Sequence, residues 1–242
     1  MSYYTDIGFE ANSNKDIIDL FNKIYSNKNY PLMVWDIQDA KENVVLTMQK
    51  LGEIRYFSKL KDDNNEILEL GLAHNNENIV KMDIIDVDYS NKKGFPILQL
   101  EKDGIHFWFE CPNVEIFNME NEKECEVKIS SFANNVKIKK KGEVQTIEKN
   151  TFSLENECYI PDWNGDNTIA LIQGIITNYK LEKNVITNNN YYAIDIDCLG
   201  LKIKALVDVT LINEKDIIIG DVLSGEFWNC AILVADNHPD YF

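Results

Sequence analysis

The stretch from Tyr191 to Asp208, YYAIDIDCLGLKIKALVD, shows most clearly how part of this chain folds. Aliphatic and charged side chains alternate on both sides of Leu199–Gly200, a pattern typical of two strands joined by a tight turn. A shift of one residue would place aspartates opposite isoleucines, so the pattern predicts its own register. The cross-strand charge pairs that this register predicts are Asp195 with Lys204 and Asp197 with Lys202.

The two aspartates of this stretch lie two residues apart, so both side chains leave the same face of a strand. Paired carboxylates can serve acid–base chemistry, but a lysine opposite each one lowers its pKa, which is wrong for a general acid. The sequence therefore favours a structural role. The alternative is a ligand site built from Tyr191, Asp195 and Lys204.

The composition is that of an ordinary soluble globular protein. The chain has 242 residues, of which 45% are apolar and 26% are charged, enough for one large domain or two smaller ones. No window approaches the roughly 18 apolar residues of a membrane span, and the start, MSYYTDIGFE, lacks signal-peptide features. We expect a cytoplasmic protein without a membrane segment.

Cysteine spacing and the standard motifs point away from metal and cofactor chemistry. The five cysteines are odd in number and none forms a CxxC pair, so we expect neither a disulfide framework nor a zinc site. The patterns GxxxxGKS/T, GxGxxG, GxSxG and HExxH do not occur. We expect no cofactor, no metal and no catalytic activity.

Net charge gives the strongest global indication about partners. The formal charge is −16, and Arg55 is the one arginine in the chain. Nucleic-acid affinity depends on cationic contacts to phosphate, so this composition argues against a nucleic-acid ligand. An acidic surface suits a basic protein partner through electrostatic complementarity, although acidity can also serve solubility alone.

The N-terminal part predicts one helix followed by an antiparallel meander. Apolar residues spaced i, i+3, i+4 and i+7 form one helical stripe, preceded by a cap-like Ser13 with Asp16; the stripe comprises Ile17, Leu20, Phe21 and Ile24. From Val44 to Lys149, short apolar runs alternate with turn sequences every eight to twelve residues. CEVKISSF and VKIKK are expected to be separate strands within it.

A segment rich in Asp and Asn near residue 160 predicts a boundary between two domains, 1–158 and 159–242. After it come a long strand interrupted by Gly174, the hairpin, a connection and the returning segment GDVLSGEFWNCAILV. Over residues 168–235 this order resembles a small OB-fold barrel. The predicted fold class is α+β, mainly antiparallel β, with an OB-like barrel after the meander. The resemblance implies a binding face on the barrel's second and third strands.

Two further groups are candidate sites. In GIHFWFECP, alternation places His106, Trp108 and Glu110 on one strand face, either as a small binding surface or as a half-buried sheet face. Asp162, Asn164 and Asp166 have the spacing of a calcium loop, but the expected Gly and Glu at later positions are missing. An Asx-type turn explains them better.

These observations leave three hypotheses. The first is a non-catalytic protein that binds another protein, such as an acidic immunity protein or inhibitor of a basic toxin. The second is an oligonucleotide- or saccharide-binding module that uses the OB-like face. The third is an enzyme without a recognisable motif, for which a deep pocket holding His106 or His74 beside a buried carboxylate would be the sign.

Overall fold

The fold is known from a computed structural model, which is mostly β with one α-helix. It describes residues 14–26, 31–38, 43–61, 66–90, 94–117, 119, 121–141, 145–146, 153–154, 157–163 and 165–234. Ser13 and Asn164, which bear on the expectations above, lie outside these residues, and the side chain of Ile17 is not described either. None of the helices in the described ranges is long and apolar enough to cross a membrane.

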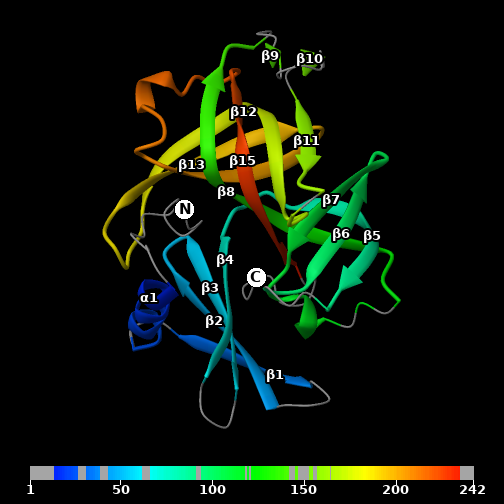
Figure 1. Cartoon of the computed structure of the whole chain (residues 1–242), viewed down its shortest axis with the longest axis vertical. Coiled ribbons are helices and arrows are strands. Elements are labelled where there is room, and N and C mark those ends of the chain that lie inside the picture. Colours follow the sequence, from blue (N-terminus) through cyan, green and yellow to red (C-terminus); the bar gives the residue numbers. More distant parts are fainter. Residues whose placement is uncertain are drawn as a thin grey trace.

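The helix α1 (Asn14–Ser26) precedes a four-stranded antiparallel sheet, with strand order β1-β2-β3-β4. Its strands are β1 (Leu32–Gln38), β2 (Asn43–Leu51), β3 (Ile54–Lys61) and β4 (Ile67–His74). The expected meander is therefore confirmed here, and it begins one strand earlier than the sequence suggested. Figure 1 shows this sheet beside α1, below the larger nine-stranded sheet.

The nine-stranded sheet has the order β11-β12-β13-β14-β8-β15-β7-β6-β5, with further pairings of β12 with β15 and β8 with β5. Its strands are β5 (Val80–Asp88), β6 (Ile97–Lys102), β7 (Ile105–Glu110), β8 (Glu124–Lys139), β11 (Cys158–Pro161), β12 (Ile169–Lys183), β13 (Asn190–Cys198), β14 (Leu201–Asp208) and β15 (Val222–Leu233). Most neighbours are antiparallel, but β14–β8 and β15–β7 are parallel. A separate two-stranded ribbon is formed by β9 (Gln145–Thr146) and β10 (Ser153–Leu154).

Within the larger sheet, the pairings β12–β13–β14–β8–β15–β12 close a ring of five strands, seen in the upper half of Figure 1. Four of these strands come from the C-terminal third, and β8 comes from before residue 158. The hydrogen-bonded sheet therefore joins strands from both sides of the expected domain boundary, and the division at 158/159 stays a prediction.

The strand β8 corrects one expectation. CEVKISSF and VKIKK form a single strand, because the Asn-rich segment between them stays in the ladder. Asn134 is the extra residue of a bulge in β8, opposite Glu226 and Phe227 of β15, and its side chain donates to Glu226 Oε1 (2.6 Å). Residues that read as a loop are therefore held in extended form by the neighbouring strand.

The hairpin of β13 and β14 has the predicted register, with Asp195 opposite Lys204 and Asp197 opposite Lys202. Leu199 and Gly200 both have positive φ, +55° and +79°, as a type I′ turn requires. The two-residue loop is thus confirmed, with leucine in a conformation that usually favours glycine or asparagine.

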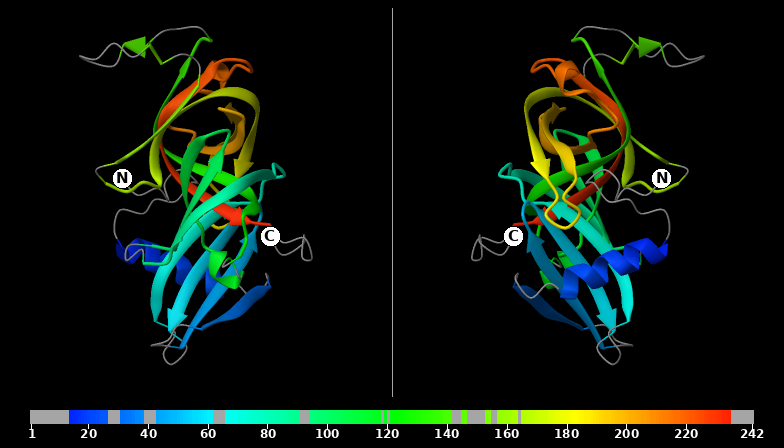
Figure 2. Two further views of the ribbon diagram at one scale, coloured as in Figure 1. Left: turned by 90° about the vertical axis from the view of Figure 1, so that its right-hand side faces the viewer. Right: turned by 90° about the vertical axis from the view of Figure 1, so that its left-hand side faces the viewer.

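Alternate residues of the ring strands face two different hydrophobic cores, one inside the ring and one outside it. One fills the ring and continues under β5–β7, with Ile196 and Ile203 among its buried residues. The other lies between the ring's outer surface and the four-stranded sheet and includes Tyr191 and Trp228. It also holds Phe21 and Ile24 of α1, with Leu20 packed against them, so these three residues of the predicted stripe are confirmed as the packing face. Figure 2 shows α1 on the side of the smaller sheet.

Candidate functional site

A row of carboxylates crosses the outer face of the nine-stranded sheet. Asp83 of β5 is directly opposite Glu101 of β6 on one side and Glu124 of β8 on the other. Glu101 in turn is directly opposite His106 of β7. Directly opposite residues on neighbouring strands point to the same face with Cβ atoms about 5 Å apart. We call Glu124, Asp83 and Glu101 the acidic row.

Like charges placed directly opposite each other destabilise a sheet. One lysine relieves part of this repulsion: Lys81 Nζ lies 2.5 Å from Glu124 Oε2, and that carboxylate raises the pKa of Lys81. The contrast with β13–β14 is direct, because there each aspartate faces a lysine. The strand register therefore places opposite charges side by side in β13–β14, and it places like charges side by side in the acidic row.

The surroundings of the acidic row combine further acids with exposed apolar side chains. Glu126, Asp86 and Asp88 are exposed on the same strands. Ile85, the extra residue of a bulge in β5, is 46% exposed. The other large apolar side chains exposed at the two ends of β5 are Ile79 and Tyr89. Exposed apolar residues rimmed by charge are typical of protein-binding surfaces.

The predicted face of His106 and Trp108 forms the aromatic end of this surface. Gln99 Nε2 donates to His106 Nδ1 (3.1 Å), so Nε2 carries the hydrogen and donates to Glu101 Oε2 (3.1 Å). The rings of His106 and Trp108 are edge-packed with centroids 6.2 Å apart. Trp163, from the turn after β11, packs edge-on against Trp108 at 5.0 Å. The sequence did not place Trp163 here, because it follows Trp108 by more than fifty residues.

The third predicted residue of that face, Glu110, does not reach the surface. It is 7% exposed, and its carboxylate lies against Gly94 and accepts hydrogen bonds from the Phe95 backbone and the Trp228 side chain. Burial first, and then the nearby Asp166, raise the pKa of Glu110 to about 8. Glu110 is therefore protonated at neutral pH and lies apart from the charged acidic row.

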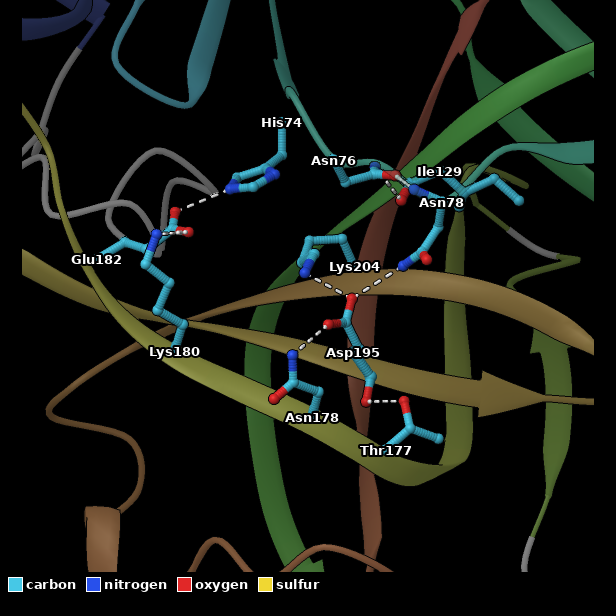
Figure 3. A network of polar contacts seen from close by, with 10 residues as sticks. All are labelled: His74, Asn76, Asn78, Ile129, Thr177, Asn178, Lys180, Glu182, Asp195 and Lys204. Carbon is cyan, nitrogen blue, oxygen red and sulfur yellow. Dashed lines mark hydrogen bonds and ion pairs between the residues drawn. The ribbon is translucent and has the colours of Figure 1, made fainter.

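The second predicted group, Tyr191, Asp195 and Lys204, is divided by the structure. Lys204 Nζ lies 2.5 Å from Asp195 Oδ1, which also accepts from Asn78 Nδ2 at 2.9 Å (Figure 3). Asn78 belongs to the connection between β4 and β5, so this segment lies over the hairpin. Tyr191 lies farther along the same face of β13, is 1% exposed and donates its hydroxyl to Glu182 instead. These three residues form no common open site.

Tyr191 belongs instead to a buried cluster that the sequence did not predict. Its hydroxyl donates to Glu182 Oε2 (2.8 Å), and the same oxygen lies 2.9 Å from His74 Nε2. The side chains of His74 and Glu182 are 3% and 9% exposed. Burial alone would raise the pKa of Glu182, but the hydrogen bond and charge of His74, with the Tyr191 hydroxyl, lower it to about 2.

Figure 3 shows that this His74–Glu182 contact bridges the end of β4 and strand β12. It therefore connects the four-stranded sheet to the five-stranded ring. A histidine beside a buried carboxylate is part of the sign that we named for an enzyme. Both partners are enclosed by protein, so we interpret the contact as a buried hydrogen bond between two packed units.

The remaining candidates have structural explanations. Asp166 Oδ1 accepts from the backbone and hydroxyl of Thr168 (2.9 and 2.6 Å), as an Asx-type turn predicts. Arg55 is 2% exposed and donates to Asn75 Oδ1 (2.5 Å), so the one arginine does not present its guanidinium to a phosphate backbone.

The five cysteines carry free thiols and none is exposed. Across the described residues, no group of three or more Asp, Glu, His and Cys side chains could hold a metal ion.

Comparison of the chain with models of known protein families, with curated proteins and with solved structures found no match.

Proposed function

We propose that the protein is a non-catalytic, cytoplasmic protein-binding protein whose acidic row and surrounding surface bind a basic protein. The observation that carries the proposal is the opposition of Glu124, Asp83 and Glu101 across three adjacent strands. This arrangement costs folding free energy, and a cationic partner would recover that cost on binding. An immunity-like or inhibitor-like role towards a basic toxin or nuclease fits this chemistry.

The composition of the same surface supports a protein partner rather than a simple ion. Exposed Ile79, Ile85 and Tyr89 supply apolar contact area, which small cations do not use. The carboxylates around them supply steering and specificity. The net charge of −16 acts in the same direction over longer distances.

We also propose that the five-stranded ring is an OB-like barrel whose fifth strand is supplied from earlier in the chain. The strands β12, β13, β14 and β15 follow the order that the resemblance implies, and β8 completes the ring. The usual connecting helix is reduced to the 3₁₀ turn Glu214–Asp216.

This arrangement argues against the oligonucleotide- or saccharide-binding alternative. The outer face of β13 and β14, where the resemblance implies ligand binding, carries the buried Tyr191 and is contacted by Asn78. A base or sugar would have to displace packed protein to reach it.

A quantitative capture experiment tests the proposal. The tagged wild type would be compared, in lysate of its source, with D83N/E101Q and with D19N/E214Q, which removes the same charge from exposed positions elsewhere. We expect a basic protein that is captured by the wild type and the control, weakly by D83N/E101Q, and released by high salt. Equal capture by all three proteins, or no basic protein at all, would overturn the proposal.

A further inference from the structure

We infer that Trp163 is the point on this surface that receives an arginine side chain of the basic partner. The inference rests on the proposed function, because it specifies the chemistry of the partner at the same surface. It follows from the exposure, the support and the charge around one indole ring.

Trp163 is the most exposed large hydrophobic side chain in the described part of the chain, at 65%. A tight turn holds it outward: its backbone N–H donates to Pro161 O (3.1 Å), and Gly165 N donates to Asp162 O (3.2 Å). Since most of the surface of an indole is its two flat faces, this exposure leaves π surface open to a ligand. The backbone hydrogen bond at Trp163 restrains the position from which the ring projects, which lowers the entropy cost of binding.

Trp108 supports Trp163 from the sheet. The two rings meet edge-on at 79°, so one indole buttresses the other without covering it by stacking. Trp108 is itself fixed, because its backbone N–H and carbonyl both contact the Tyr159 hydroxyl, at 3.1 and 3.3 Å. Tryptophan is enriched among the residues that anchor protein interfaces, and Trp163 combines exposure with support from a neighbouring ring.

The carboxylates on the strands around Trp108, against which Trp163 packs, favour a cation. Asp86 lies in the same cross-strand row as Trp108, separated by Gln99, and Glu101 lies one row away. An anionic ligand is repelled here, and a neutral sugar gains nothing from the carboxylates. A planar guanidinium can stack on the indole and pair with a carboxylate together, which an ammonium group does less well.

The test uses two defined probes, nona-arginine and nona-lysine, with binding measured by calorimetry at moderate salt. For the wild type we expect nona-arginine to bind about two- to five-fold more tightly than nona-lysine. Trp163→Ala should bring this ratio close to one while leaving nona-lysine binding unchanged, and Trp163→Phe should keep part of the preference. Thermal unfolding would confirm that these surface variants are folded.

The variants separate failure of the inference from failure of the proposed function. An unchanged arginine preference in Trp163→Ala, or no preference in the wild type, would overturn the inference even if D83N/E101Q weakens both probes. If D83N/E101Q weakens neither probe more than D19N/E214Q does, the acidic row is not the binding surface, and both proposals fail.

Discussion

At the scale of single residues, Glu110 makes the stability of the protein depend on pH. Its folded pKa of about 8 lies above the ordinary value of 4.5. Between these pH values the folded state holds a proton that the unfolded state has lost. The contribution is therefore complete below about pH 4.5 and is lost as the pH rises through 8.

Glu110→Gln tests this directly, because glutamine resembles the protonated carboxyl group. We expect the variant to unfold in urea with a free energy on the order of 1–3 kcal/mol higher than the wild type at pH 8, and with a smaller difference at pH 5. An equal effect at the two pH values would show that the carboxyl group is ionised in the folded protein.

The contribution of Glu182 to stability depends on pH in the opposite direction from that of Glu110. Its folded pKa of about 2 lies below 4.5, so its contribution is present above pH 4.5 and is lost as the pH falls toward 2. Glu182→Gln leaves His74 without its charged partner and should lower the unfolding free energy at pH 7 by about 2–4 kcal/mol. Lys180→Gln, which changes an exposed neighbour of Glu182, should change it far less. Equal losses in the two variants would contradict this assignment.

At the scale of elements, the hairpin offers two charge pairs that differ mainly in exposure. The side chains of Asp195 and Lys204 are 16% and 14% exposed, whereas those of Asp197 and Lys202 are 29% and 49% exposed. Double-mutant cycles to alanine should give a larger coupling energy for the first pair, about 1–2 kcal/mol, than for the second, about 0.2–1 kcal/mol. Equal couplings would show that the Asn78 contact and the lower exposure add nothing.

The close approach of β13 explains why the long strand β12 has a glycine, Gly174, midway along it. A Cβ at this position would lie 2.9 Å from the backbone oxygen of Asp197. Gly174→Ala should therefore force β12 and β13 apart and destabilise the protein by about 1–3 kcal/mol, measured by thermal or urea unfolding. A neutral result would mean that the strands can shift at this contact.

The same two elements show how much the sequence could predict. The hairpin register followed from neighbouring residues alone, because charge and size match only in one alignment. The ring could not be predicted in full, since its fifth strand, β8, lies before the other four. The His74–Glu182 contact joins residues 108 positions apart, and no local pattern indicates it.

The acidic row shows the same limit at the functional surface. Each strand of the row was expected, but the opposition of Glu124, Asp83 and Glu101 depends on how β8, β5 and β6 align. The sequence did place His106 and Trp108 on one face. It missed Trp163, because only the path of the turn after β11 brings that ring to the sheet.

At the scale of the whole molecule, charged residues are arranged in one region so that they stabilise the fold and in another so that they destabilise it. Each aspartate of the β13–β14 hairpin faces a lysine, whereas three carboxylates are opposed on β5, β6 and β8. Natural proteins accept such local losses of stability at functional surfaces. The cost of the acidic row to the free energy of unfolding can therefore be measured without the partner.

The most direct test is the free energy of unfolding in urea at low salt and pH 7 for the wild type, D83N/E101Q and D19N/E214Q. Both variants remove two negative charges, so general repulsion changes equally in the two. We expect D83N/E101Q to be more stable than the wild type by about 0.5–1.5 kcal/mol, and D19N/E214Q to differ from it by less than about 0.5 kcal/mol. If D83N/E101Q is no more stable than the control, the acidic row carries no structural cost, which contradicts the proposal that the row is kept for binding.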